Sequence, residues 1–345
     1  MLNDRRCEDV VMTIGTSSAS DPRARTRLTR NLPAFAAAIT VVLWALSFIG
    51  IRSAGQAFSP GALAVGRLAV AVVAVVALSV IVGIVAIGSR NPPAAKPWVP
   101  PRGRSLALVI AYGVAWFGGY TVVLNWAEQH LDAGTSALLV NFAPILVAII
   151  AGLFLGEGFS PRLSTGIAIA FGGVVLITVG GAGPSADWLG VGLGLLAAVL
   201  YAGGVLVQKV ALASVDALTA TLWGAVAGLV VTLPFVPAAL VEVRSASAAD
   251  LASMVFLGVG PTAVAFTTWA YALSRTSAGA MAATTLVVPA LVIVASWLLL
   301  NEVPTPLRIV GGVLALVGVA LTRDLIRMPA WWGRFLADRR AAGPR

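Results

Sequence analysis

The residues of this sequence best suited to bind a ligand are amides, hydroxyls and aromatic rings inside long apolar segments. Tyr112, Trp116 and Tyr120 recur at four-residue spacing, so on a helix they share one face. The candidate binding residues are Trp44, Ser47, Trp116, Asn141, Tyr201, Thr284 and Thr285. Such groups recognise a ligand by hydrogen bonds and ring stacking. The hydroxyl groups could instead have a structural role, in which each forms a hydrogen bond with the backbone of its own helix.

Ionisable groups are nearly absent from these segments. No Asp, Glu, Lys or His lies in the middle of one, and Glu128, His130 and Asp132 cluster at the end of one. For Arg67, about two turns inside a segment, two interpretations are open: the side chain snorkels outward, or it faces the interior as an anion anchor. One histidine and one cysteine, Cys7, supply neither a nucleophile with its base nor a metal cluster. We therefore expect no enzyme activity, no metal and no cofactor.

The elements that must position these residues are apolar helices. The chain of 345 residues is 59% hydrophobic and 11% charged, whereas a soluble domain averages about 25% charged residues. Its apolar runs are long enough to cross ~30 Å of hydrocarbon. The expected spans are residues 33–52, 61–85, 105–127, 133–155, 162–179, 188–207, 217–241, 251–273, 278–300 and 307–322. This pattern predicts an all-α polytopic membrane protein with ten transmembrane helices, the seventh breaking at Pro234 and Pro237.

The positive charges predict the orientation of the chain. Of the 23 Lys and Arg, only Arg52, Arg244 and Arg308 fall in loops expected outside, and most others lie in tails and inner loops. Both termini are therefore expected in the cytoplasm. This bias explains the net charge of +9 without nucleic acid as a partner. Residues 1–32 are expected to be a disordered basic tail. Residues 323–345 form either a helix on the inner membrane surface or a plain solvated tail.

An internal repeat links two parts of the chain. Residues 133–176 align without gaps on residues 278–321, at an offset of 145. The matched pairs that hydrophobicity alone does not require are Pro144 with Pro289, Glu157 with Glu302, Pro161 with Pro306, Gly166 with Gly311, and Gly173 with Gly318. A weaker match at an offset of 157 places Trp44 on Tyr201 and Arg52 on Lys209. We therefore predict two five-helix repeats, residues 33–180 and 188–322.

The odd number of spans in each half has a structural consequence. Equivalent helices then cross the membrane in opposite directions, which makes an inverted repeat able to open to either side about a midplane site. Pro144 and Pro289 occupy equivalent positions in two oppositely directed helices. Because a proline frees backbone groups that a moving helix can pair again, we expect these two to be paired gating elements.

A second repeated motif lies at the start of the last helix of each half. A serine comes directly before Pro161, and a threonine comes directly before Pro306. Each copy therefore places an N-cap hydroxyl before a proline at the first helical position. Glu157 and Glu302 stand just ahead of these helices, where a carboxylate suits the positive end of the helix dipole. Capping at the interface and a role in transport are the two interpretations of these glutamates.

At this point the sequence resembles the drug/metabolite transporter superfamily, specifically the EamA-type permeases. The segments that carry the resemblance are WALSFIGIRSAG at 44–55, ALLVNFAPILVAIIAGLFLGEGFSPRLSTGIAIAFGGVVLI at 137–177 and AATTLVVPALVIVASWLLLNEVPTPLRIVGGVLALVGVAL at 282–321. The latter two each have a mid-helix proline, an apolar run, a glutamate two positions after a leucine, and a proline-led helix rich in glycine. The resemblance implies a ten-helix fold with a central cavity that moves metabolites, often outward.

These observations lead to one expected function and one alternative. The expected function is a secondary transporter in the inner or plasma membrane, exporting small neutral or zwitterionic metabolites or drugs by alternating access. Its partners are the lipid bilayer and a small-molecule substrate, with a homodimer as a candidate assembly. The alternative is a non-transporting membrane scaffold or enzyme subunit, for which an inverted repeat has no evident use.

Overall fold

The computed structural model of the protein describes residues 22–87, 97–131, 133–154, 161–179, 188–300 and 306–322. Every regular element in these ranges is a helix. The elements are α1 (Pro22–Ala54), α2 (Pro60–Ile87), α3 (Arg104–Tyr112), η1 (Gly113–Tyr120), α4 (Thr121–His130), α5 (Ala133–Val140), α6 (Ala143–Phe154), α7 (Pro161–Val179), α8 (Trp188–Ala211), α9 (Ala217–Thr232), η2 (Leu233–Phe235), α10 (Val236–Ser245), α11 (Ala248–Leu257), η3 (Gly258–Val264), α12 (Ala265–Leu273), α13 (Ala278–Ala283), η4 (Thr284–Val287), α14 (Val288–Leu300) and α15 (Pro306–Thr322).

Helices cover the expected spans, and several of them border residues outside the described ranges. Seven helical stretches in the described residues are long and apolar enough to cross a membrane: Asn31–Ala54, Pro60–Ile84, Arg104–His130, Trp188–Ala211, Ala217–Ser245, Ala248–Leu273 and Ala278–Leu299. The helices over the fourth, fifth and tenth expected spans are shorter. The fourth is divided into α5 and α6, with 8 and 12 residues, and α7 and α15 have 19 and 17 residues.

The structure adds detail to the expected ends of the first and seventh spans. Helix α1 begins at Pro22 and continues through Pro33, so it starts inside the segment 1–32 that was expected to be a tail. Its Arg, Leu and Ala residues are good helix formers, which explains the extension. The seventh span does break at its prolines: the 3-10 turn η2 contains Pro234, and α10 begins one residue before Pro237. Residues 323–345 lie outside the described residues.

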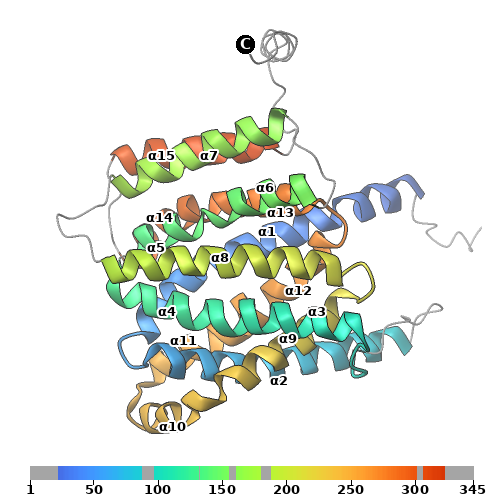
Figure 1. The fold of residues 1–345 in the computed structure, drawn as a ribbon, viewed down its shortest axis with the longest axis vertical. Helices are drawn as coiled ribbons and strands as arrows, with labels where there is room; N and C mark the ends of the chain where they lie inside the picture. The colour runs from blue at the N-terminus through green and yellow to red at the C-terminus, as the bar shows by residue number, and fades with distance from the viewer. Residues whose placement is uncertain are drawn as a thin grey trace, which may run out of the picture.

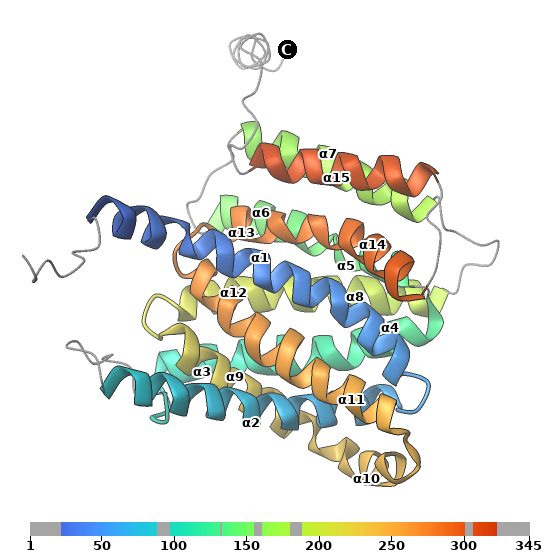
Figure 2. The same ribbon diagram turned by 180° about the vertical axis from the view of Figure 1, so that it is seen from behind.

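The helices form layers that run in similar directions (Figures 1 and 2). The pair α7 and α15, packed along each other, forms the outermost layer, and α5, α6, α13 and α14 lie beneath it. Next come α1 and α8, and beyond them the remaining helices of both halves. Helix α1 contacts α11, η3 and α12, while α8 contacts α3, η1 and α4. The first helix of each expected half therefore packs on the third helix of the other half.

The helices are also interrupted at corresponding positions of the two expected halves. The π-helical turn η1 starts at Gly113 and η3 starts at Gly258, which are 145 residues apart. Helix α5 ends in a turn at Asn141 and Phe142, and α13 ends in the 3-10 turn η4. Because π turns and broken helices place backbone groups outside the regular α-helical pattern, they commonly occur at functional sites.

Glycines at the π turns allow two pairs of helices to approach closely. A Cβ atom on Gly113 would lie 2.5 Å from the carbonyl oxygen of Gly224 and 2.9 Å from the Cβ of Ala227. A Cβ atom on Gly258 would lie 2.7 Å from the carbonyl oxygen of Arg67 and 2.6 Å from the Cβ of Val70. Gly224 and Ala227 follow Arg67 and Val70 by 157 residues. The two expected halves thus show the same helix contact, in which no residue larger than glycine fits.

Candidate functional site

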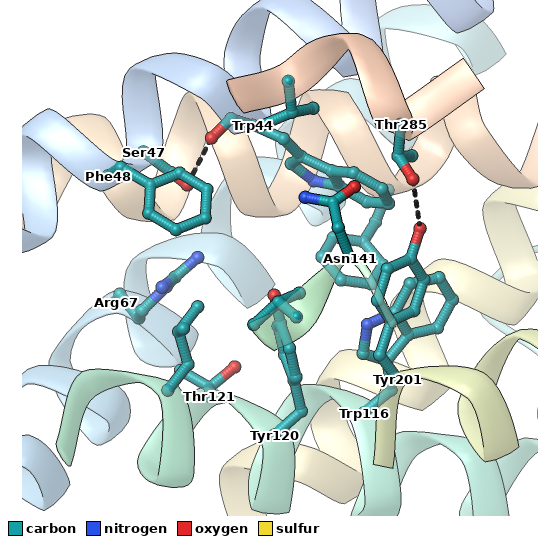
Figure 3. Close-up of a pocket in the computed structure, with 14 residues that line it drawn as sticks. Trp44, Ser47, Phe48, Arg67, Trp116, Tyr120, Thr121, Asn141, Tyr201 and Thr285 are labelled. Atoms are coloured by element: carbon teal, nitrogen blue, oxygen red, sulfur yellow. Dashed lines mark hydrogen bonds between the residues drawn. The ribbon is translucent and has the colours of Figure 1, made fainter. Parts of the chain in front are cut away.

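The first helix of each expected half meets the interrupted helices around a central cavity (Figure 3). The residues that line it are Trp44, Ser47, Phe48, Arg67, Trp116, Tyr120, Thr121, Leu124, Val140, Asn141, Tyr201, Phe266, Thr285 and Val288. The cavity volume is about 50 Å³, whereas sites for small molecules commonly measure about 300–1,000 Å³. A solute larger than a few waters would therefore have to separate the side chains that line it.

Aromatic rings form the centre of this site. The indole of Trp116 stacks on the phenol ring of Tyr201, with centroids 5.1 Å apart and planes at 19°. Trp44 stands edge-on to Trp116 at 5.9 Å. Phe266 packs edge-on to Trp116 at 4.8 Å, and Trp269 lies 4.9 Å from Trp44. These five residues, here called the aromatic cluster, come from α1, η1, α8 and α12, so both halves contribute to it.

Hydrogen bonds hold the polar atoms of the aromatic cluster. The indole N–H of Trp44 donates to the carbonyl oxygen of Pro261 at 3.1 Å, inside the π turn η3. The Tyr201 hydroxyl donates to Oγ1 of Thr285 at 3.3 Å. Trp269 donates through Nε1 to Oε1 of Gln208 at 3.1 Å. Each of these bonds joins two different helices, so the rings are fixed by packing and by polar contacts together.

Asn141 lies in the turn between α5 and α6, and it lines the cavity as predicted. The residue is 4% exposed. Its Nδ2 donates to the carbonyl oxygen of Ala137 at 2.6 Å, while its buried Oδ1 has no hydrogen-bond partner among the described residues. A buried acceptor without a donor is unfavourable. The amide oxygen is therefore available to a donor that enters the cavity.

Arg67 faces the cavity, so the interpretation in which it snorkels outward is wrong. The residue is 6% exposed and belongs to the cavity lining. Its Nε and Nη2 both donate to Oγ1 of Thr262, at 3.2 and 3.0 Å. The hydroxyl of Thr262 in turn donates to the carbonyl oxygen of Leu257 at 2.7 Å. The side chain turns inward because the π turn η3 places this acceptor beside it.

Of the two adjacent threonines of η4, one lines the cavity and the other does not. Thr285 lines the cavity and donates to the carbonyl oxygen of Ala282 at 2.7 Å, in addition to accepting from Tyr201. Thr284 is buried, donates to the carbonyl oxygen of Met281 at 2.5 Å and is not part of the cavity lining. Its role as a binding residue therefore stays a prediction, and its backbone bond fits the alternative for hydroxyls in apolar helices. The Ser47 hydroxyl also donates to its own helix, at the Trp44 carbonyl oxygen, but Ser47 does line the cavity.

The repeated prolines lie at the interruptions and helix starts. Pro144 and Pro289 are buried, and each is the second residue of its helix, α6 or α14. Neither belongs to the cavity lining. Pro161 and Pro306 are the first residues of α7 and α15, as expected. Glu157 and Glu302 lie outside the described residues.

Several lining residues were missed by the sequence reasoning. Phe48, Thr121 and Phe266 have no polar or repeat signal that would set them apart in an apolar helix. Helical spacing could have found one of them, because Phe48 is four residues from Trp44. Of the three aromatic residues spaced by four, Tyr112 faces away from the cavity and donates its hydroxyl to the carbonyl oxygen of Ala220.

A second cavity, of about 230 Å³, lies near the end where α1 and α4 finish. Its polar lining includes Arg52, Gln56, Asn125, Glu128 and Gln129. Both carboxylate oxygens of Glu128 are buried without a hydrogen-bond partner among the described residues. Glu128 therefore lies inside the protein near the end of its helix, whereas the other candidate residues lie deeper in the bundle.

The architecture is similar to that of a protein solved by crystallography. The two structures superpose with a TM-score of 0.66 over 86% of this chain and 99% of that chain, at 16% sequence identity. At this level of identity the likeness concerns the fold alone. It extends to nearly the whole of the solved chain, so the layered helical arrangement described above is not peculiar to this sequence.

Sequence relatives carry names of transporters. A protein of Streptantibioticus cattleyicolor named as a probable terminal-alkyne amino-acid exporter is 34% identical over 83% of this chain and 92% of its own length. An uncharacterized transporter of Bacillus subtilis is 30% identical over 82% of this chain and 88% of its own. A protein of Escherichia coli named as a probable amino-acid metabolite efflux pump is 26% identical over 65% of this chain and 77% of its own.

The family model of the EamA-like transporters matches the chain twice, over residues 31–179 and 188–323. These two matches cover nearly all the helices described above and agree with the resemblance noted in the sequence. The apolar helical stretches make the protein an integral, multi-pass membrane protein. On the strength of the fold, the relatives and this double match, the chain belongs to the EamA-like transporter family, a family of membrane transporters.

Proposed function

We propose that the chain is a secondary transporter that exports small neutral or zwitterionic metabolites or drugs by alternating access. The observation that carries this proposal is the origin of the cavity wall, to which both halves contribute. Trp44 of α1 and Tyr201 of α8 stand at equivalent positions, and both line the cavity. A site between two related halves is open to either side in turn when one half rocks against the other.

The architecture proposed for this mechanism is ten membrane crossings in two inverted repeats, residues 33–180 and 188–322. Three observations support it: the repeated glycine contacts of the π turns, the corresponding helix interruptions, and the double match of the family model. The bias of basic residues toward tails and alternate loops supports cytoplasmic termini and a plasma-membrane location.

The names of two relatives support export as the direction of transport. One is named as an exporter of terminal-alkyne amino acids and the other as an efflux pump for amino-acid metabolites. The cavity supports the same range of solutes, because an amide, a guanidinium and aromatic rings can hold a polar head and an apolar side chain. Amino acids and their derivatives are therefore the first solutes to test.

The decisive experiment compares the metabolites retained and released by cells with and without the gene. Loss of the gene should raise the intracellular level of the exported solute and lower its level in the medium. Once a solute is found, Asn141→Leu and Trp44→Ala should each reduce its efflux about tenfold, which corresponds to about 1.4 kcal/mol. Phe35→Ala is the matched control, since Phe35 lies on α1 and is 65% exposed.

The experiment also tests the site. Wild-type efflux in both cavity variants, at equal amounts of protein in the membrane, would show that solutes pass elsewhere. The alternative function, a non-transporting scaffold or enzyme subunit, expects no change in any solute when the gene is removed. An unchanged metabolite profile under several growth conditions would favour that alternative over transport.

A further inference from the structure

The second cavity follows the central cavity along the same two helices. On α4, Thr121 lines the central cavity, whereas Asn125 and Glu128, further along the helix, line the second cavity. On α1, Phe48 lines the central cavity, and Arg52, four residues later, lines the second cavity and is exposed. The two cavities therefore lie in series, and the second leads from the central cavity toward the end of the bundle that is expected outside.

Three buried oxygen atoms in this cavity have no donor among the described residues. They are Oδ1 of Asn125 and both carboxylate oxygens of Glu128. Asn125 is 3% exposed, and its Nδ2 donates to the carbonyl oxygen of Pro60 at 3.1 Å. Asn125 and Glu128 are three residues apart and so share one face of α4. A buried acceptor without a donor is unfavourable, and here three of them lie within one helical turn.

Positive charges surround Glu128. Helix α4 packs against α1, α2, η1, α5 and α8. From these elements the titratable groups that act on the carboxylate are Arg52 of α1, Arg67 of α2 and Tyr120 of η1, and His130 lies on α4 itself. Helix α5 has no acidic or basic side chain, and the basic residue of α8 lies in its last turn. The two guanidinium groups favour the ionised carboxylate, whereas its burial and the acceptor on Asn125 favour the protonated form.

The ligand that fits these oxygens is a proton. A hard metal cation takes about six or more oxygen ligands, and the described residues contain no group of three His, Cys, Asp or Glu that could hold one. The lining of the cavity also includes a guanidinium, that of Arg52, which repels a cation. A proton needs no additional space, and it converts one of the Glu128 oxygens from an acceptor into a donor.

We propose that Glu128 is a proton-binding site on the outer part of the transport path, and that its proton changes the charge around Arg67 in the central cavity. The proton comes from water in the second cavity, whose volume of about 230 Å³ has room for several waters. The protonated carboxyl group donates to Oδ1 of Asn125. Because the carboxylate acts electrostatically on Arg67, its neutralisation leaves the central cavity more positive.

The proposal has a consequence for transport. When the proton returns to water, the negative charge of Glu128 again offsets the positive charge of Arg67. The external pH and the occupancy of the central cavity are thereby linked. This proposal rests on the proposed transport function, but proton binding can be tested without any solute.

The first measurement detects the proton itself. The full chain in lipid nanodiscs is titrated between about pH 4 and 10, the range from carboxyl to tyrosine titration, and followed by infrared difference spectroscopy. We expect the C=O band of a buried protonated carboxyl group to appear as the pH falls. Glu128→Gln should lack this band, and Asp250→Asn, which removes a carboxylate at the start of α11, should keep it. A Glu128→Gln protein with the wild-type band would overturn the proposal.

The second measurement tests the link to the central cavity. In Arg67→Gln the band should appear at a higher pH, equivalent to a roughly tenfold gain in proton affinity, because the lost guanidinium favoured the ionised carboxylate. Arg67→Lys keeps the charge and should restore the wild-type titration. Arg244→Gln, which removes an exposed charge on α10, should leave the titration unchanged. An unshifted band in Arg67→Gln would refute the link.

A further variant tests the hydrogen bond of the protonated form. Asn125→Leu removes the acceptor, so the band should appear at a lower pH, equivalent to a loss of about two- to tenfold in proton affinity. The frequency of the band should also change, because the C=O stretch depends on the hydrogen bond that the carboxyl group makes. The same titration and frequency in Asn125→Leu and the wild type would refute this contact.

The last measurement distinguishes a failure of proton binding from a failure of transport. Proteoliposomes loaded with a mixture of amino acids are diluted into acidic or into pH-matched buffer. Efflux from wild-type proteoliposomes should differ between the two buffers, and efflux from Glu128→Gln proteoliposomes should not. Absence of any efflux, although the nanodiscs show the band and its shift, would count against the proposed transport function and leave the proton site standing. Efflux that is equal in both buffers in the wild type would support transport and overturn the role of Glu128 in it.

Discussion

The indole ring of Trp44 stands edge-on to the phenol ring of Tyr201, with centroids 6.1 Å apart and planes at 84°. The two residues are separated by 157 positions, and they start from equivalent places on α1 and α8. Because equivalent residues of two related halves can meet only close to the axis that relates them, this contact marks the axis of the proposed repeat. The cavity is built around that point, as a site shared by both halves requires.

Two substitutions of Tyr201 should separate the role of its ring from that of its hydroxyl. Tyr201→Phe removes the bond to Thr285 and keeps the stacking on Trp116. It should cost about 0.5–1.5 kcal/mol of stability. Tyr201→Ala removes the ring as well and should cost about 3–5 kcal/mol. Thermal unfolding in detergent measures both, and equal losses would show that the ring packing contributes nothing.

Adjacent glycines on α8 give a matched test of close packing at the cavity. A Cβ atom on Gly204 would lie 2.6 Å from the Cβ of Trp116, whereas one on Gly203 meets nothing within 4 Å. Gly204→Ala should destabilise the protein by about 1–3 kcal/mol through overpacking, and it should reduce transport. Gly203→Ala should be neutral or slightly stabilising. Unfolding temperature and efflux, measured on both variants, would contradict this account if Gly204→Ala behaved like Gly203→Ala.

The interrupted helices predict a kinetic role for their prolines. Pro144 and Pro289 each stand at the second position of the helix that follows the break. Alanine at either position lets the backbone continue as one regular helix, which should resist the motion between open states. We expect Pro144→Ala and Pro289→Ala to insert normally and to change the transport rate about tenfold, or about 1.4 kcal/mol in the barrier.

The control for the proline variants is Pro161→Ala, an exposed first residue of α7 where proline only starts a helix. Its transport rate should equal that of the wild type. Normal rates in Pro144→Ala and Pro289→Ala would reduce these prolines to packing features.

The membrane topology can be tested with reporters at two places. Ten crossings with a cytoplasmic N-terminus place Arg345 inside and the segment between α7 and α8 outside. Fusions of a reporter active on one side only should therefore give opposite signals at Arg345 and in residues 180–187. Signals from the same side would contradict the five crossings of the second half, and with them both the total of ten and the inverted arrangement of the halves.

Most of the helical pattern could be predicted from the sequence, because an apolar span is a local property of some 20 residues. The interruptions could be predicted only in part. Pro234 and Pro237 locate the break before α10 correctly. The π turns at Gly113 and Gly258 have no proline at their start, and they depend on close contacts with helices more than 100 positions away. No local pattern carries that information.

The same limit explains the outcome at the cavity. Trp44 and Trp116 could be chosen as candidates because they lie in the middle of their spans, away from the interfaces where tryptophans usually gather. The orientation of Arg67 was left open, because its hydrogen-bond acceptor, Thr262, is 195 residues away. Thr284 and Thr285 are adjacent and chemically identical, and only the geometry of the 3-10 turn directs one of them to the cavity.

The separation of Arg67 from Thr262 also bears on how the protein is made. At about 5–20 residues per second, translation delivers Thr262 roughly 10–40 s after Arg67. During that interval the nascent first half contains an arginine whose insertion at mid-membrane is unfavourable by about 2.5–3.5 kcal/mol. A chain released before α11 and η3 are synthesised would keep this guanidinium without its acceptor. The buried guanidinium is therefore satisfied only once the second half of the chain has docked against α2.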